Sequence, residues 1–151
     1  MNARAINADI SILRRILTAM RTIAVVGLSQ KSYRPSQVVV KYLIDHGYRI
    51  IPVNPAYTQV LGETCYPSLR GVPEPIDVVD CFRRAEHMSP LAADAVAIGA
   101  KVLWLQLGVV NVEATQRAAA AGLAVVTDCC IKIEHARLLG GLECSAQALQ
   151  T

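Results

Sequence analysis

The segment Thr22–Ser36, TIAVVGLSQKSYRPS, decides the fold of this chain. A run of β-branched and apolar residues, Ile23 to Val26, ends at Gly27, and a polar loop then leads to an apolar-periodic stretch from Val38. This order is typical of a buried strand, a tight turn and the beginning of a helix. Such a turn suits a phosphate, because glycine lets the backbone approach closely and the helix start offers unpaired N–H groups.

The charge around this turn indicates what kind of ligand to expect. Lys31 and Arg34 follow the glycine, so we expect an anionic and phosphorylated ligand. The whole chain is only mildly basic, with a net charge of +3 over 151 residues, and it contains no basic block or aromatic-plus-basic stripe. We therefore expect a small nucleotide-type molecule and no nucleic-acid partner.

Composition predicts one α/β domain that spans residues 1–151. Apolar residues make up 53% of the chain and charged residues 18%, which suits a parallel sheet covered on both faces. No apolar stretch reaches the ~20 residues that a membrane span requires, and charged residues interrupt Met1–Met20, so we expect a cytoplasmic protein. Five cysteines, an odd number without metal-ligand spacing, are interpreted as reduced thiols.

Five short apolar segments alternate with helical patterns along the chain. The expected strands are Ile23–Val26, Arg49–Val53, Ile76–Phe82, Lys101–Leu105 and Leu123–Thr127. The expected helices are Asn7–Met20, Ser36–His46, Ser89–Gly99 with Ser89 as its cap, Asn111–Ala121 and Ile131–Leu139. The segment between Asn54 and Pro75 is expected to be irregular, and the tail from Gly140 has no clear pattern.

This alternation predicts a doubly wound, Rossmann-like parallel sheet with helices on both faces. Short connections favour the order third, second, first, fourth and fifth strand, with the switch point between the first and fourth. Ligands of such sheets bind beyond the carboxyl ends of the strands.

The turn departs from the dinucleotide fingerprint G-x-G-x-x-G in two ways. Ser29 and Ser32 stand where the second and third glycines belong. The second strand ends in Val53-Asn54-Pro55 and lacks the acidic residue that would accept the ribose hydroxyls of NAD. Both departures count against NAD.

Several separated motifs resemble the stand-alone CoA-binding proteins, which are akin to the N-terminal CoA-binding domain of the succinyl-CoA synthetase alpha subunit. The resemblance covers about Ile12–Leu138. Its motifs are AVVGLS with Arg34-Pro35-Ser36, IIPVNP at Ile50–Pro55, VLGETCYPSL at Val60–Leu69, VPEPIDVVDCFRR at Val72–Arg84, LWLQLGVVN at Leu103–Asn111 and CIKIEH at Cys130–His135. Six motifs in this order are far more specific than any one alone.

The resemblance implies a Rossmann fold that binds coenzyme A or an acyl-CoA in the predicted crevice. By position, the family's diphosphate contacts would fall on the backbone of Gly27, Leu28, Ser29 and Gln30, with Lys31 and Arg34 as cationic neighbours. The adenosine part would lie near Asn54 and Pro55, and the adenine or pantetheine arm would border Phe82, Arg83, Gln106, Leu107 and Gly108. No residue is assigned a catalytic or metal-binding role.

Two departures from the family pattern limit the transfer. Cys129 stands where relatives often have Arg, so one positive contact is missing or replaced. The synthetase subunit continues into a second domain with a phosphorylated histidine, whereas this sequence stops short of one, so we do not expect its ligase mechanism.

Two functions from different classes follow. A non-enzymatic module that binds coenzyme A or an acyl-CoA is favoured, because the sequence shows no nucleophile–base pair, metal set or second catalytic domain. The alternative is an enzyme, either an NAD(P)-linked oxidoreductase or a CoA-dependent activity in the same crevice. A redox role for Cys129-Cys130 stays open, and the hydrophobic N-terminal helix suggests a homodimer.

Overall fold

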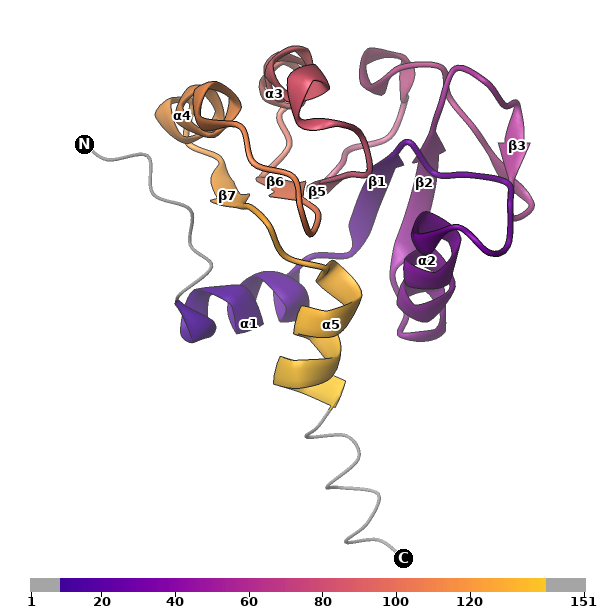
Figure 1. Cartoon of the computed structure of the whole chain (residues 1–151), viewed down its shortest axis with the longest axis horizontal. Helices are drawn as coiled ribbons and strands as arrows, with labels where there is room; N and C mark the ends of the chain where they lie inside the picture. The colour runs from indigo at the N-terminus through magenta and orange to yellow at the C-terminus, as the bar shows by residue number, and fades with distance from the viewer. Residues whose placement is uncertain (1–8, 141–151) are drawn as a thin grey trace, which may run out of the picture.

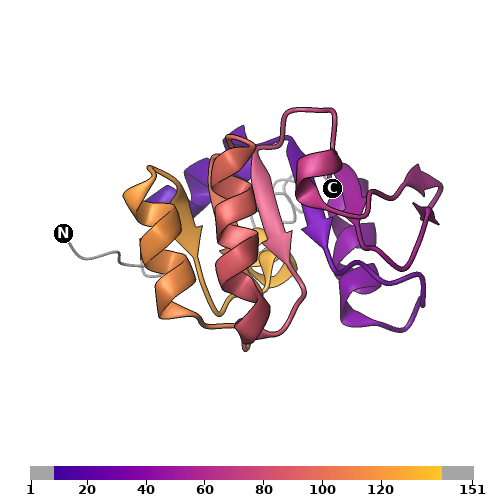
Figure 2. The ribbon, with the colours of Figure 1, turned by 90° about the horizontal axis from the view of Figure 1, so that it is seen from above.

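The computed structural model describes residues 9–140, in which five parallel strands form the central sheet (Figure 1). These strands are β1 (Thr22–Val26), β2 (Arg49–Val53), β5 (Val78–Cys81), β6 (Val102–Leu105) and β7 (Ala124–Val126). They point the same way and bring their carboxyl ends to one edge (Figure 2). The predicted class, an α/β Rossmann-like parallel sheet, is confirmed. The predicted tail and the beginning of the first helix fall outside the described residues.

The predicted strand order is wrong. The sheet runs β2-β1-β5-β6-β7, so the third strand along the chain pairs with the first instead of the second. The long connection 54–77 makes this possible, because it passes over β1 before Asp77 N–H donates to the carbonyl of Thr22. The switch point of the sheet consequently lies between β1 and β5.

Helices cover both faces of the sheet (Figure 1). One face carries α1 (Ile10–Ala19), α2 (Pro35–Asp45) and α5 (Ile131–His135), which continues in a π-helical turn, Ala136–Gly140. The other face carries α3 (Met88–Ala97) and α4 (Val112–Ala120). No helix in the described part of the chain is long and apolar enough to cross a membrane.

Side chains alternate along each strand and thereby build two apolar layers. Val25 and Trp104 belong to the layer of α1, α2 and α5, whereas Ala24, Val79 and Leu103 belong to the layer of α3 and α4. All five are fully buried. Burial on both faces explains why the strand sequences are continuously apolar.

The first helix uses its apolar face inside the domain. Leu13, Ile16 and Leu17 are buried in the same layer as α2 and α5. Asp9 caps the helix by accepting from the Ile12 amide at 3.1 Å. The hydrophobicity of this helix therefore has an intramolecular explanation and does not by itself require a partner subunit.

The connection after β2 contains structure that the sequence analysis missed. A two-stranded antiparallel hairpin, β3 (Gln59–Val60) and β4 (Glu63–Thr64), turns through Leu61 and Gly62, which have φ angles of 54° and 77°. A two-residue hairpin turn with positive φ at both positions matches the twist of the strands. The connection then forms a 3₁₀ turn, Leu69–Gly71, and the Leu69 side chain is buried in the α3 layer.

The predicted cap of the third helix is also displaced. A 3₁₀ turn, Ala85–His87, follows β5, and α3 begins directly after it at Met88 with His87 at the N-cap. Ser89 lies inside the first turn of the helix and is not its cap. The fully buried Met88 side chain anchors the helix start, which is a packing effect that the local sequence does not reveal.

An aromatic cluster joins α2 to α5. The hydroxyl of Tyr42 lies 2.8 Å from Nδ1 of the buried His135, and the ring of His46 stacks on Tyr42 with centroids 4.0 Å apart. His135 therefore packs between helices, and its ring bonds Tyr42 in the helical layer.

One carboxyl group lies within the sheet itself. Asp80, on β5, is flanked by Val25 of β1 and Trp104 of β6, and it is completely buried. Its Oδ1 accepts from Nε2 of Gln106, while Oδ2 has no partner among the described residues. Burial raises the pKa of Asp80 to about 7 and outweighs the lowering effect of the Gln106 hydrogen bond.

This carboxyl should make the protein lose stability as the pH rises. The pKa of an aspartate in an unfolded chain is about 3.9, so between that value and about 7 the folded state holds a proton that the unfolded state has released. The free energy of unfolding should therefore fall by a few kcal/mol across this range, at about 1.4 kcal/mol per unit. Asp80→Asn should remove the fall, as measured by urea denaturation at pH 5 and pH 8.

Asp45→Asn, at an exposed position on α2, is the matched control and should retain the pH dependence of the wild type. If Asp80→Asn and Asp45→Asn show the same pH dependence, the buried carboxyl is not its source.

Candidate functional site

The loops that follow the parallel strands gather at the carboxyl edge of the sheet (Figure 2). Gly27 directly follows β1 and therefore lies at the β1/β5 switch point of that edge. Gly27 has a φ angle of 87°, and its N–H donates to the carbonyl of Val53 at 2.8 Å. A Cβ at this position would lie 2.5 Å from the carbonyl oxygen of Phe82. Only glycine combines this backbone conformation with so close an approach to the chain leaving β5.

Two serine hydroxyls hold the loop after Gly27. The Oγ of Ser36, a buried residue in the first turn of α2, accepts from the Ser29 amide at 3.1 Å. The Oγ of Ser29 accepts from the Lys31 amide at 3.0 Å. The amides of Leu28 and Gln30 have no acceptor among the described residues. Leu28 is fully buried as a residue, whereas Gln30 is exposed, so of these two amides the Gln30 amide lies in an exposed residue.

Asn54 fixes this loop to the end of β2. Its Nδ2 donates to the carbonyl of Leu28 at 3.2 Å, and its Oδ1 accepts from the Ala56 amide at 2.9 Å. The Asn54 side chain is thus engaged within the protein on both sides. These contacts make Asn54 a spacer between two loops, and its predicted place near the adenosine part of a ligand stays a prediction.

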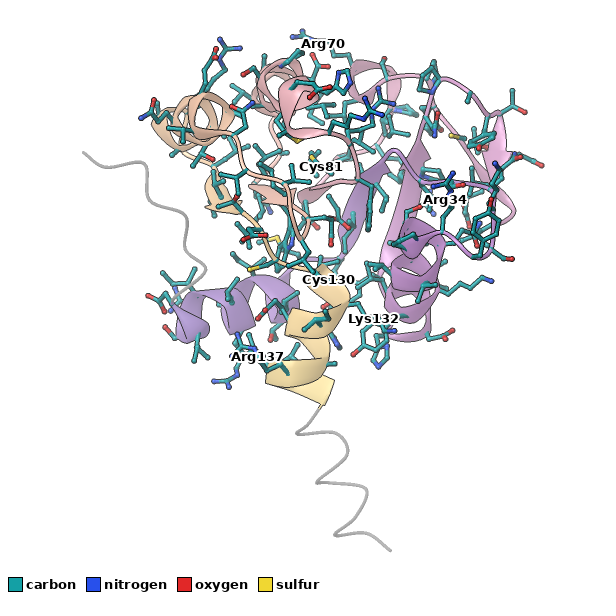
Figure 3. All side chains as sticks on the ribbon, in the orientation of Figure 1. Arg34, Arg70, Cys81, Cys130, Lys132 and Arg137 are labelled. Atoms are coloured by element: carbon teal, nitrogen blue, oxygen red, sulfur yellow. The ribbon has the colours of Figure 1, made fainter. Side chains whose placement is uncertain are left out.

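A cavity of about 320 Å³ opens beside the loop. It is lined by Gly27, Ser29, Lys31, Arg34, Pro35, Ser36, Tyr57 and Phe82. The lining contains two cations and no carboxylate, and neither Lys31 nor Arg34 forms an ion pair with a described residue. Arg34 stands at the N-cap of α2, whose Pro35 begins the helix (Figure 3). Helix dipole and side-chain charges together favour an anion here.

The cavity brings together residues that are far apart in the sequence. Phe82 follows β5, and Tyr57 belongs to the loop after β2. Tyr57 ends the stretch Asn54–Tyr57, which the position after β2 predicts to line the crevice. Pro35 and Ser36 were not predicted as cavity residues, although they belong to the motif Arg34-Pro35-Ser36.

Pro55 and Arg83, both predicted site residues, line another cavity of about 250 Å³ on the α3 side of the sheet. Its other lining residues are Val26, Val53, Pro67, Ser68, Leu69, His87, Pro90, Leu91 and Asp94. The Arg83 stem also borders Gly27, since its Cδ lies 3.0 Å from where a Gly27 Cβ would stand. Arg83 therefore lies between the two cavities.

Of the predicted site residues that follow β6, Gln106 lies in the interior and Leu107 lies on the surface. The side chain of Gln106 is buried and donates to Asp80, while its amide donates to the carbonyl of Cys81 and its carbonyl accepts from the Val109 amide. The side chain of Leu107 is 66% exposed. The amide of Gly108 donates to Oδ1 of Asp128 at 2.7 Å, which links the loops after β6 and β7.

The cysteine pair after β7 lies at the start of α5, apart from Arg34 (Figure 3). Cys65, Cys81, Cys129 and Cys130 are free thiols, and Cys144 falls outside the described residues. Burial raises the pKa of the Cys129 thiol, and the nearby Glu134 and Asp128 carboxylates raise it further. These surroundings disfavour the thiolate that disulfide exchange requires.

Comparison with known proteins gives a consistent family assignment. A family model described as "CoA binding domain" matches residues 21–136. The uncharacterized protein YneT of Bacillus subtilis (strain 168) is 43% identical over 124 residues, which cover 82% of this chain and 92% of that protein. The ADP-forming acetate–CoA ligase I of Archaeoglobus fulgidus is 33% identical over 58 residues, which make up 38% of this chain and only 8% of the ligase.

A solved structure agrees with the sequence matches. The hypothetical protein from Pyrococcus horikoshii OT3 superimposes with a TM-score of 0.87 at 43% sequence identity. The match covers 91% of this chain and 97% of that chain. The two proteins therefore share the fold over nearly their whole length.

Gly27→Ala should destabilise the protein more than Gly47→Ala. Both glycines have nearly the same φ, 87° and 88°, but nothing lies within 4 Å of a Cβ at Gly47. Each substitution incurs the left-handed backbone penalty of about 1–2 kcal/mol, and Gly27→Ala adds a steric cost of about 1–3 kcal/mol from the Phe82 carbonyl. Urea denaturation of the two variants measures the difference, and equal losses would contradict the close approach.

Proposed function

This chain belongs to the CoA binding domain family, and from that premise we propose that it binds coenzyme A or an acyl-CoA at the carboxyl edge of its sheet. We propose further that it acts as a binding module without catalytic chemistry of its own. The observation that carries the proposal is the cavity at the glycine turn, where two cations without ion-pair partners among the described residues lie beside the loop after β1.

The diphosphate of the ligand is assigned to the loop after β1. The amide of Gln30 would donate to its oxygens, and the backbone of Gly27, Leu28 and Ser29 would lie alongside. Lys31 and Arg34 would neutralise the charge from the cavity wall. Hydrogen bonds between charged partners are the strong ones, so these groups should supply much of the affinity.

The two ends of the ligand would leave the loop in different directions. The adenosine part is assigned to the side of Asn54, Pro55 and Tyr57, where the Tyr57 ring lines the cavity. The adenine or pantetheine arm would run along Phe82 and Arg83 toward the backbone of Gln106, Leu107 and Gly108. Arg83 supports such a path because it lines the cavity on the α3 side and its Cδ lies 3.0 Å from where a Gly27 Cβ would stand.

The hydrogen bonds of the serine hydroxyls in the cavity favour a binding role over an enzymatic one. Ser29 and Ser36 each accept a hydrogen bond from a backbone amide, and no described histidine lines the cavity at the glycine turn. A serine nucleophile requires an adjacent base, which the lining described here does not supply. The NAD(P)-linked alternative is distinguished by which ligand binds, and a CoA-dependent enzyme by chemical turnover of the bound acyl-CoA.

Arg34→Ala should weaken the binding of coenzyme A. Loss of a hydrogen bond to a charged group costs about 1.5–3 kcal/mol, which is about a 10- to 150-fold increase in Kd. Calorimetric titration of the reduced protein with CoA, acetyl-CoA, NAD and NADP identifies the ligand, and the tightest is repeated with the variant.

Arg14→Ala is the control, because Arg14 is exposed on α1, away from the cavity. It should bind CoA as the wild type does. Binding of a nicotinamide nucleotide without CoA or acetyl-CoA would contradict the proposal and favour the oxidoreductase.

Two further expectations belong to this proposal, namely a homodimer and a cytoplasmic location. Light scattering at micromolar protein concentration tests the first, and a monomer would contradict it. A fluorescent fusion to the full chain, followed by fractionation, tests the second.

A further inference from the structure

A third cavity lies against the other side chains of the glycine-turn loop. Ser29 and Lys31 line the cavity at the glycine turn, whereas Gln30 and Ser32 line this one, which has a volume of about 500 Å³. Its remaining walls come from α2 and from the hairpin β3–β4. The hairpin is attached to the loop directly, because Nε2 of Gln30 donates to the carbonyl of Gln59 at 2.7 Å.

Gln37 gives this cavity a neutral polar side chain. The residue is only 3% exposed, it lines the cavity, and its side-chain amide has no hydrogen-bond partner among the described residues. Among the described residues the buried side-chain atom without a partner is Oδ2 of Asp80, so the Gln37 amide is open to the cavity. The amide can therefore donate a hydrogen bond to a polar ligand there.

Lys41 gives the cavity its charge. It lies four residues after Gln37, hence on the same face of α2, and it lines the same cavity. It is exposed and forms no ion pair with a described residue, and no carboxylate is among the lining residues. One cation beside a neutral amide donor is a combination suited to a phosphate monoester.

We propose that Lys41 and Gln37 bind a phosphate monoester in this cavity and, on the basis of the proposed function, that this group is the 3′-phosphate of coenzyme A. The ribose that carries the 3′-phosphate is attached directly to the diphosphate. Because Gln30 and Ser32 alternate with Ser29 and Lys31 along one loop, the diphosphate and the 3′-phosphate would be held by neighbouring positions. The cavity thereby recognises the 3′-phosphate, which coenzyme A has and dephospho-CoA lacks.

The test compares coenzyme A with dephospho-CoA, which lacks only the 3′-phosphate, by calorimetric titration. The wild type should bind coenzyme A at least about tenfold more tightly than dephospho-CoA, as expected for a charged hydrogen bond. Lys41→Gln should remove most of this preference and leave the affinity for dephospho-CoA unchanged. Gln37→Glu, which places a negative charge in the cavity at equal size, should weaken coenzyme A more than dephospho-CoA.

Lys101→Gln is the matched control, since Lys101 precedes β6 at the opposite edge of the sheet and pairs with Asp77. It should retain the preference. Equal binding of both nucleotides by the wild type, or a preference that survives Lys41→Gln, overturns this inference while the proposed function stands. If the wild type binds neither nucleotide, and inorganic phosphate alone gives heat that Lys41→Gln abolishes, the cavity binds free phosphate and both assignments to coenzyme A fail.

Discussion

The close approach of Gly27 to the Phe82 carbonyl is the constraint on which the carboxyl edge depends. A Cβ at position 27 would lie 2.5 Å from that oxygen. The end of β1 and the chain leaving β5 can therefore approach this closely only because residue 27 has no side chain. The left-handed backbone of Gly27 then turns the chain out of the sheet, while its amide stays bonded to the end of β2. One residue thus joins three strands and directs the following loop outward.

The loop that follows Gly27, between β1 and α2, is held mainly by hydrogen bonds from short polar side chains. Ser36 and Asn54 bind its backbone from α2 and from the end of β2, and Gln30 attaches it to the hairpin. These contacts leave the longer cations, Lys31 and Arg34, free to face the cavity. The arrangement separates two tasks, since neutral groups set the shape of the loop and charged groups remain for an anion.

The carboxyl group of Asp80, close to the same edge, is a buried polar group that destabilises the core. A buried carboxyl with one unpartnered oxygen is costly, and hydrophobic residues surround it in the sheet. Its hydrogen bond from Gln106 positions the residue that begins the loop after β6. The carboxyl therefore couples the interior of the sheet to the loops at its carboxyl edge, and its proton makes that coupling sensitive to pH.

The sequence by itself determined the α/β class, the bounds of β2, the capping of α4 by Asn111 and the glycine turn with its two cations, because each depends on local patterns of burial, capping and charge. Tertiary structure alone decided the strand order, since neither β5 nor β6 carries a local mark of its neighbour in the sheet. It also turned the Gln106 side chain inward, because the buried carboxyl of Asp80 with which it bonds is apparent only once the strands are packed in the sheet.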